Sequence, residues 1–172
     1  VGRFGASADI DGDVMVIGEP EAELAFSEPC PSACGGVWVF GRYGSGAVDW
    51  STFYRVNAPV VTPDEQFGTA VALSHDRFVV GAPGTGRAYV FNLTANPTFS
   101  PPSGPAGAVA TLTSTDLGFG ATVALDAFHL AVGAPTAGVV TVFRLVSSAP
   151  GLETWTSEAS VAAPPSAGAG FG

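Results

Sequence analysis

The chain has 172 residues, of which 47% are hydrophobic and 12% are charged, and its formal net charge is −9 with no lysine. An acidic chain without a basic stripe is a poor partner for nucleic acid, because affinity for a phosphate backbone comes largely from Lys and Arg. No apolar run approaches the roughly 20 residues that cross a bilayer, so membrane insertion is not expected. The length is that of one domain.

One phrase occurs three times along the chain. It reads FGASADIDGDVMVIGEP from Phe4 to Pro20, FGTAVALSHDRFVVGAP from Phe67 to Pro83, and FGATVALDAFHLAVGAP from Phe119 to Pro135. Repetition on this scale indicates structural units that bury their apolar faces by stacking on one another. The positions that define the repeat motif are Phe4, Gly5, Gly18, Pro20, Phe67, Gly68, Gly81, Pro83, Phe119, Gly120, Gly133 and Pro135.

The repeats differ in length. Phe67, Phe119 and Phe171 are spaced by 52 residues, whereas Phe4 and Phe67 are 63 apart. The extra residues of the first repeat lie within the segment from Glu21 to Cys34. We therefore expect one repeat domain over residues 1–172, with units at approximately 4–66, 67–118 and 119–170, and with 171–172 starting a further repeat. The chain begins at Val1 without an initiator Met or a signal peptide, so it is either a mature product or a fragment.

Each repeat predicts four strands. The opening phrase reads as a hairpin, with Asp11-Gly12 as a type I′ turn in the first copy, and 23 Gly and 14 Pro punctuate the short apolar runs. Third strands are expected at 37–40, 88–91 and 139–143, and fourth strands near 50–56, 108–112 and 154–161. The second strand is apolar almost without alternation, as in Val14 to Ile17, which indicates burial on both faces.

A sheet that is covered on both sides by copies of itself is a propeller blade. The predicted fold is therefore all-β, with β-propeller-type blades of four antiparallel strands. A β-solenoid is the alternative, in which strands would pair between successive units.

The motif resembles the FG-GAP repeat of integrin α-subunit propellers and of many secreted bacterial and algal proteins. The resemblance covers all three units. It implies a propeller with Phe-Gly on the innermost strand and Gly-Ala-Pro ending the second strand. Because three blades are too few for such a ring, it also implies a partial propeller or one completed by oligomerisation.

Many integrin-type repeats carry a calcium loop, D-x-D-x-D-G-x-x-D, between the first two strands. Here that connection is only a tight turn, and the metal-free form of the repeat is the closer match. Asp9, Asp11 and Asp13 come nearest to a hard-cation site. A solvated acidic turn is the favoured interpretation, a weak calcium site is the alternative, and no metal or cofactor is expected.

The insertion in the first repeat carries Cys30 and Cys34. Flanking prolines favour a turn, so a disulfide is expected, with free or intermolecular thiols as the alternative. Oxidised cysteines would place the protein in an extracellular setting. The same insertion is acidic and is the predicted partner-binding loop, through Glu21, Glu23, Phe26 and Glu28.

Covalent glycans are expected on a second loop. Asn92-Leu93-Thr94 is an N-glycosylation sequon. The following Pro- and Ser-rich segment resembles the O-glycosylated motifs of plant and algal wall proteins. The expected sites are Asn92, Thr98, Ser100 and Ser103. An unmodified flexible loop is the alternative.

No motif predicts catalysis. The chain has no nucleophile elbow, H-E-x-x-H or P-loop, and neither His75 nor His129 recurs between repeats. The pair Asp64-Glu65 could do acid and base work only if it faced a cleft. The repeated aromatic residues are interpreted as packing between blades, with a sugar platform at Trp50 or Trp155 as the alternative.

The expected function is that of a noncatalytic extracellular structural or adhesive glycoprotein module. Its expected partners are other protein chains, in particular further copies of itself joined head to tail. A ligand-binding receptor propeller of integrin type and an accessory propeller of a secreted hydrolase are the alternatives.

Overall fold

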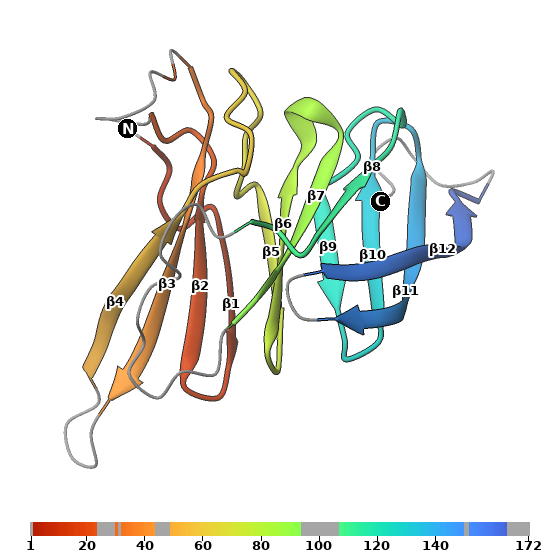
Figure 1. Ribbon diagram of the computed structural model, residues 1–172. Helices are drawn as coiled ribbons and strands as arrows, with labels where there is room; N and C mark the ends of the chain where they lie inside the picture. The colour runs from red at the N-terminus through yellow and green to blue at the C-terminus, as the bar shows by residue number, and fades with distance from the viewer. Residues whose placement is uncertain are drawn as a thin grey trace.

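The computed structural model describes residues 2–23, 30, 32–43, 49–93, 107–149 and 152–164. In these residues the chain forms twelve β-strands and one short 3-10 helix, Pro83–Thr85. The strands make three four-stranded antiparallel sheets that follow one another along the chain (Figure 1). The all-β, blade-type fold is thus confirmed. Within the same residues no helix is long and apolar enough to cross a membrane.

Each sheet is a four-stranded meander, and we number the sheets as blades 1 to 3. Blade 1 contains β1 (Ser7–Asp11), β2 (Val14–Glu19), β3 (Gly36–Tyr43) and β4 (Asp49–Val56). Blade 2 contains β5 (Ala70–Ser74), β6 (Arg77–Ala82), β7 (Arg87–Asn92) and β8 (Ala110–Thr113). Blade 3 contains β9 (Thr122–Leu125), β10 (His129–Ala134), β11 (Val139–Ala149) and β12 (Leu152–Ala162).

Strand pairing excludes the solenoid. The strand ladders run within each blade, and between blades the described residues show only an isolated parallel bridge from Gly35 to Phe67. The blades meet through their first strands instead, since β5 contacts β1 on one side and β9 on the other (Figure 1). The innermost strands therefore lie side by side, as in a propeller.

The first hairpin turn differs from the prediction. Asp11 pairs with Val14, so the central residues are Gly12 and Asp13 rather than Asp11 and Gly12. Of these two, only Gly12 has a positive φ, 58°. A type I′ turn needs positive φ at both central positions, so the predicted turn type is wrong. His75, with φ 54°, takes the equivalent place between β5 and β6.

The Phe-Gly pairs do not lie on the innermost strands, as the resemblance implied, but just before them. The residue before each Phe and the Gly after it have φ values between 57° and 98°, which curl the chain and prevent a regular ladder. This curl lets the Gly amide bond the second glycine of the same repeat. The bonds run from Gly5 N to Gly18 O (3.0 Å), Gly68 N to Gly81 O (3.1 Å) and Gly120 N to Gly133 O (3.1 Å).

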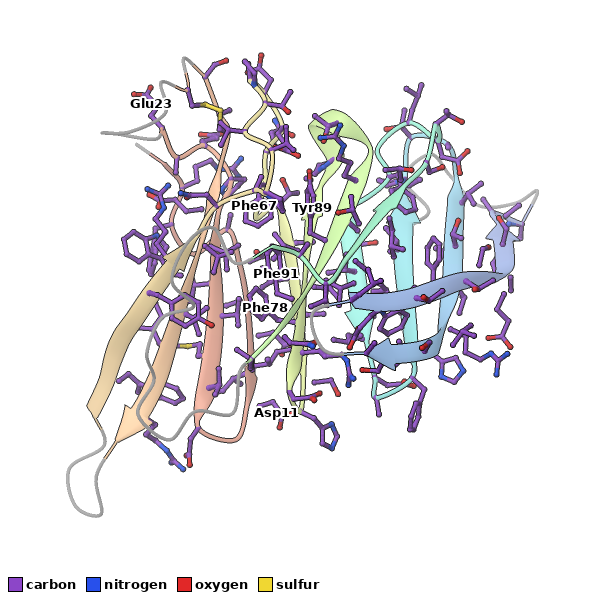
Figure 2. The ribbon with its side chains drawn as sticks, in the orientation of Figure 1. Asp11, Glu23, Phe67, Phe78, Tyr89 and Phe91 are labelled. Atoms are coloured by element: carbon purple, nitrogen blue, oxygen red, sulfur yellow. A yellow bond between two sulfur atoms is a disulfide. The ribbon has the colours of Figure 1, made fainter. Side chains whose placement is uncertain are left out.

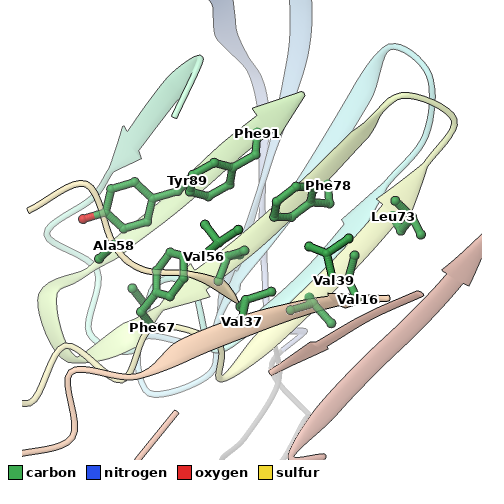
Figure 3. Packing of buried hydrophobic residues seen from close by; sticks show 13 residues of the cluster. Val16, Val37, Val39, Val56, Ala58, Phe67, Leu73, Phe78, Tyr89 and Phe91 are labelled. Atoms are coloured by element: carbon green, nitrogen blue, oxygen red, sulfur yellow. The ribbon is translucent and has the colours of Figure 1, made fainter. Parts of the chain in front are cut away.

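Two apolar cores fill the junctions between blades. We call the face that a blade turns toward its predecessor its incoming face, and the other its outgoing face. At the junction of blades 1 and 2 the buried residues of the outgoing face are small and aliphatic, with the half-buried Tyr54 packed against them, whereas half of the buried residues of the incoming face are aromatic (Figure 3). The outgoing residues are Val16, Val37, Val39, Val56 and Ala58; the incoming residues are Phe67, Val71, Leu73, Phe78, Val80, Ala82, Tyr89 and Phe91.

The second junction repeats this arrangement. Its outgoing residues are Val79, Ala88, Val90, Val109 and Leu112, and its incoming residues are Phe119, Leu130, Val132, Ala134, Phe143 and Trp155. Strand β6 therefore supplies Val79 to one core and Phe78 and Val80 to the other. Burial of the second strand on both faces is confirmed in blade 2, because this blade has a neighbour on each side.

Candidate interaction surfaces

The incoming face of blade 1 is open. Phe4 is 54% exposed and Ile10 56% exposed, whereas their equivalents Phe67 and Leu73 are buried at 0% and 6%. The ring of Phe4 rests only edge-on against Phe40, with centroids 6.2 Å apart. We call this surface the blade 1 face; its apolar residues are Phe4, Ala8, Ile10, Met15, Ile17, Trp38 and Phe40.

The outgoing face of blade 3 is the second open surface. Val140 pairs with Val161 across the sheet, in the position that Ala88 and Leu112 occupy in blade 2. The blade 2 residues are buried, but Val140 is only half-buried and Val161 is 48% exposed. We call this surface the blade 3 face; its apolar residues are Ala124, Ala131, Val140, Val142 and Val161.

The motif glycines bring neighbouring blades into backbone contact. A Cβ atom on Gly18 would lie 2.0 Å from the carbonyl oxygen of Gly68, and one on Gly81 would lie 1.9 Å from that of Gly120. The second glycine of one repeat thus packs against the Phe-Gly glycine of the next. Gly5 has nothing within 4 Å of its Cβ position.

Side chains of β1 bind the backbone of β5 and of the β5–β6 turn. Asp9 Oδ2 accepts a hydrogen bond from Leu73 N at 2.8 Å, and Asp11 Oδ2 accepts one from His75 N at 2.7 Å. Asp13 pairs instead with Arg42, whose Nε donates to it at 2.7 Å. The three carboxylates considered for calcium thus have separate protein partners. In the part of the chain that the structure describes, no group of three or more Asp, Glu, His or Cys side chains is placed to hold a metal ion.

Glu65 forms a buried polar cluster at the first junction. Its side chain is fully buried and accepts hydrogen bonds from the hydroxyl groups of Tyr89 (2.6 Å) and Thr85 (3.1 Å). Arg87 Nη1 lies 3.6 Å from the same carboxylate oxygen. Burial, reinforced by the bond to Glu65, raises the pKa of Tyr89 to about 12. Asp64, by contrast, is exposed, so the acidic pair does not share a cleft.

A hollow opens at the edge of the blade 1 face. Its volume is about 310 Å³, and its lining consists of Gly2, Glu19, Glu21, Ala22, Glu23, Trp38 and Arg55. Trp38 Nε1 donates to Glu19 Oε2 at 2.8 Å, and the Arg55 guanidinium lies 5.4 Å from the Trp38 ring centroid. The Nε and Nη2 atoms of Arg55 are buried and have no hydrogen-bond partner among the residues that the structure describes. Sequence reasoning missed both Glu19 and Arg55. Arg55 lies outside the repeated phrases, whereas Glu19 stands in the first phrase where the other two copies have Ala82 and Ala134, and this departure was a signal that could have found it.

The cysteine loop contacts the chain that enters blade 2. Cys30 and Cys34 form a disulfide, as predicted. The carbonyl groups beside it accept backbone hydrogen bonds from the segment 64–67 (Asp64 N to Ser32 O 2.9 Å, Gln66 N to Ala33 O 2.9 Å, Phe67 N to Cys34 O 3.1 Å). Part of the cysteine loop therefore helps to hold blade 1 against the segment that leads into blade 2.

The structure describes two of the four predicted partner-binding residues, Glu21 and Glu23. Glu21 accepts a hydrogen bond from Arg3 at 3.2 Å, and Glu23 lines the hollow. Glu23 and Asp11 lie at opposite ends of the molecule (Figure 2). Phe26 and Glu28 fall outside the described residues.

Of the four predicted glycosylation sites, the structure describes only Asn92. Asn92 is the last residue of β7 and pairs with Arg77 beside the β5–β6 turn, so it lies at the end of the molecule away from the cysteine loop. It is half-buried, and its Oδ1 atom is buried without a hydrogen-bond partner in the described part of the chain. Thr98, Ser100 and Ser103 fall outside the described residues.

The remaining candidate side chains are engaged in packing or in local hydrogen bonds. Trp155 is buried in the second junction, and its Nε1 donates to Glu153 at 3.0 Å. It is therefore not available as a sugar platform. His129 is the exposed first residue of β10, and the backbone N–H groups of Phe128 and His129 lower the pKa of Asp126 by binding its carboxylate.

Comparison with known proteins supports both the repeat and the fold. Residues 50–91 match the FG-GAP repeat, which confirms the resemblance read from the motif. Among solved structures, the chain is similar to KlHsv2 with loop 6CD replaced by a Gly-Ser linker (TM-score 0.59, 8% identity, 91% of this chain and 45% of that one). It is also similar to Kluyveromyces lactis Hsv2p (TM-score 0.53, 10% identity, 94% of this chain and 62% of that one).

At such low identity these similarities show the propeller fold alone. The chain spans about half the length of the solved propellers that it matches. Comparison with curated protein sequences finds no match.

Proposed function

We propose that this chain is a noncatalytic extracellular structural or adhesive module that acts through protein–protein contacts and joins further copies of itself head to tail. The observation that carries the proposal is the pair of open blade faces. Both retain the apolar residues that equivalent positions bury at the internal junctions. Exposed apolar surface of this kind marks an interaction site.

Further features support the proposed extracellular setting and the proposed noncatalytic role. The Cys30–Cys34 disulfide is stable where the surroundings are oxidising, as they are outside the cell. The Asn92 sequon is compatible with a secreted glycoprotein. The two buried carboxylates, Glu65 and Glu153, are held by neighbouring side chains inside blade junctions, a placement that suits packing rather than turnover.

Self-association is tested by measuring mass against concentration. We expect sedimentation velocity and light scattering of the purified, glycan-free chain to show species that grow with protein concentration. Electron microscopy would then show rings or filaments. A chain that stays monomeric and folded at every concentration would contradict the proposed self-association.

A second candidate is a receptor-type propeller that binds a basic protein segment at the hollow beside the cysteine loop. The favouring observation is the convergence of Glu19, Glu21 and Glu23 on one recess. Calorimetric titration with an arginine-rich peptide at physiological salt tests it. Glu21→Gln with Glu23→Gln should abolish binding, whereas Glu158→Gln, an exposed carboxylate on β12, should not. Equal loss in both variants would indicate only nonspecific charge attraction.

A further inference from the structure

We infer that copies of this chain associate in one direction only: the blade 1 face of one copy covers the blade 3 face of the next, in the register of the internal blade junctions. This inference rests on the proposed self-association and specifies its geometry. The partner is therefore a second copy, presented by its opposite face.

The internal junctions show why the contact is directional. At both of them the buried residues of the outgoing face are aliphatic, joined at the first junction by the half-buried Tyr54, and they receive an incoming face that carries several aromatic side chains. At the first junction Phe67, Phe78 and Phe91 fill the space above Val16, Val37 and Val39 (Figure 3). Close packing demands such a match of large against small side chains.

The two open faces differ in side-chain size in the same way as the two sides of an internal junction. The blade 1 face presents Phe4, Trp38 and Phe40, whereas the apolar residues that we assign to the blade 3 face are all Ala or Val. Two blade 1 faces would set ring against ring, and two blade 3 faces would leave voids between short side chains. Only the unlike pair reproduces the packing that the chain already uses twice.

The innermost strands define the register. At the first junction Ser7 Oγ donates to the carbonyl oxygen of Gly68 at 2.9 Å. Thr122 occupies the position of Ser7 on β9, Gly5 occupies that of Gly68, and both are exposed. In the docked pair Thr122 of one copy donates to Gly5 O of the next. Such a contact joins unlike surfaces, so it propagates into a ring or a filament and not into a symmetric dimer.

Variants blocked on one face test the direction. The first, Phe4→Glu with Ile10→Glu, places charges on the blade 1 face at two exposed positions. The second, Ala124→Glu with Val161→Glu, does so on the blade 3 face, again at exposed positions. We expect each variant to be monomeric where the wild type associates. An equimolar mixture should form a 1:1 heterodimer and nothing larger, because only one unblocked pair remains.

Other outcomes have distinct meanings. If the variant blocked on blade 3 dimerises alone, the contact joins two blade 1 faces and the inference is wrong. If the variant blocked on blade 1 dimerises alone, the contact joins two blade 3 faces and the inference is again wrong. If both variants still form wild-type assemblies, association uses another surface. A monomeric wild type would overturn the proposed self-association itself.

Controls separate blocking from misfolding. Leu117→Glu, at an exposed position outside both faces, should associate as the wild type does. Circular dichroism and thermal unfolding verify each fold, and Thr122→Lys is the replacement if the double variant on blade 3 fails to fold. Tryptophan emission gives an independent readout, because Trp38 of the blade 1 face should shift to shorter wavelength in the heterodimer. Light scattering that shows a heterodimer without this shift would contradict the proposed face.

Discussion

Gly18 and Gly81 have almost no room above their Cα atoms. Each faces a backbone carbonyl of the following blade, and a methyl group would lie within 2.0 Å of that oxygen. Since the obstacle is backbone, a rotamer change cannot relieve the clash. The second glycine of the motif is therefore required by contact between blades, and its own strand conformation does not require it.

Gly81→Ala should destabilise the fold by about 1–3 kcal/mol, or more, because the second and third blades must move apart. Gly107→Ala is the matched control, since nothing lies within 4 Å of its Cβ position, and a surface change of this kind should stay within about 0.5 kcal/mol. Urea unfolding of both variants checks the prediction. Equal midpoints would contradict the close approach of Gly81 to Gly120.

Tyr89 makes stability depend on pH in the alkaline range. Its folded pKa is about 12, above the ordinary value near 10, so the folded state keeps a proton that the unfolded chain releases. The stabilisation is fully present below about pH 10 and is lost as pH rises toward 12. The chain has no lysine, so few other groups titrate there.

The loss should amount to about 2–3 kcal/mol between pH 10 and pH 12, which is two pKa units of differential ionisation. Chemical unfolding at several pH values measures it. In Tyr89→Phe this part of the decline should disappear, because the phenolic proton is gone. An identical pH profile in the variant would refute the assignment.

At the level of secondary-structure elements, blades 1 and 2 are joined by hydrogen bonds as well as by apolar packing. In strand β1, Asp9 accepts a hydrogen bond from a backbone amide of β5, and Asp11 accepts one from a backbone amide of the β5–β6 turn. The cysteine loop offers its carbonyl groups to segment 64–67. The two sets of bonds lie at different ends of the junction, and together they orient blade 2 on blade 1.

Replacing Asp9 with Ala should cost about 1–2 kcal/mol, because the Leu73 amide loses its acceptor in a partly buried place. Glu158→Ala removes an exposed carboxylate and should change stability by less than about 0.5 kcal/mol. Thermal unfolding compares the two. A smaller effect for Asp9 than for Glu158 would argue against this link between β1 and β5.

Removing the disulfide by Cys30→Ser with Cys34→Ser should lower stability by about 2 kcal/mol, the chain-entropy value for a loop of this length. The local consequence should be faster hydrogen exchange at the amides of Gln66 and Phe67, which the loop carbonyls bind. Reductant should produce the same change in the wild type and none in the variant. Unchanged exchange at both amides would show that the loop holds its form without the covalent bond.

At the scale of the whole chain, the described residues form an arc of three blades with two unlike open faces. Its apolar cores lie between blades, so every blade without a neighbour leaves half of a core exposed. Association through those ends must overcome repulsion between copies that each carry a net charge of −9. Apolar burial drives such a contact, and like charge opposes it.

Self-association should therefore strengthen as ionic strength rises. Between roughly 50 and 500 mM sodium chloride, the screening length falls severalfold and the long-range repulsion largely disappears. Sedimentation velocity at fixed protein concentration follows the change. Assemblies that dissociate in salt would point to ionic contacts in place of the apolar faces.

Much of the fold was predictable because its signals are local. Alternating small and β-branched residues, a tight turn and an apolar run define each hairpin, and the recurrence of Phe67 at Phe119 sets the repeat length. The disulfide between Cys30 and Cys34 followed from the short turn between them. These features depend on neighbours in the chain and need no knowledge of what lies across a junction.

The environment of the candidate sites was not predictable in the same way. Asp64 and Glu65 are adjacent in sequence, yet one is exposed and the other fully buried beneath Tyr89. The hollow combines Gly2, Glu19 and Arg55 from three separate segments. Such contacts depend on how blades stack, and stacking is set by side-chain volumes that are far apart in sequence.

The sequence by itself determined the repeat, the four strands of each unit and the class of fold, because hydrophobic period and glycine punctuation act over a few residues. Only the tertiary structure decided which equivalent residues are covered. Phe4 and Phe67 occupy the same place in the motif, but one is exposed and the other buried, since burial depends on whether another blade lies above the ring.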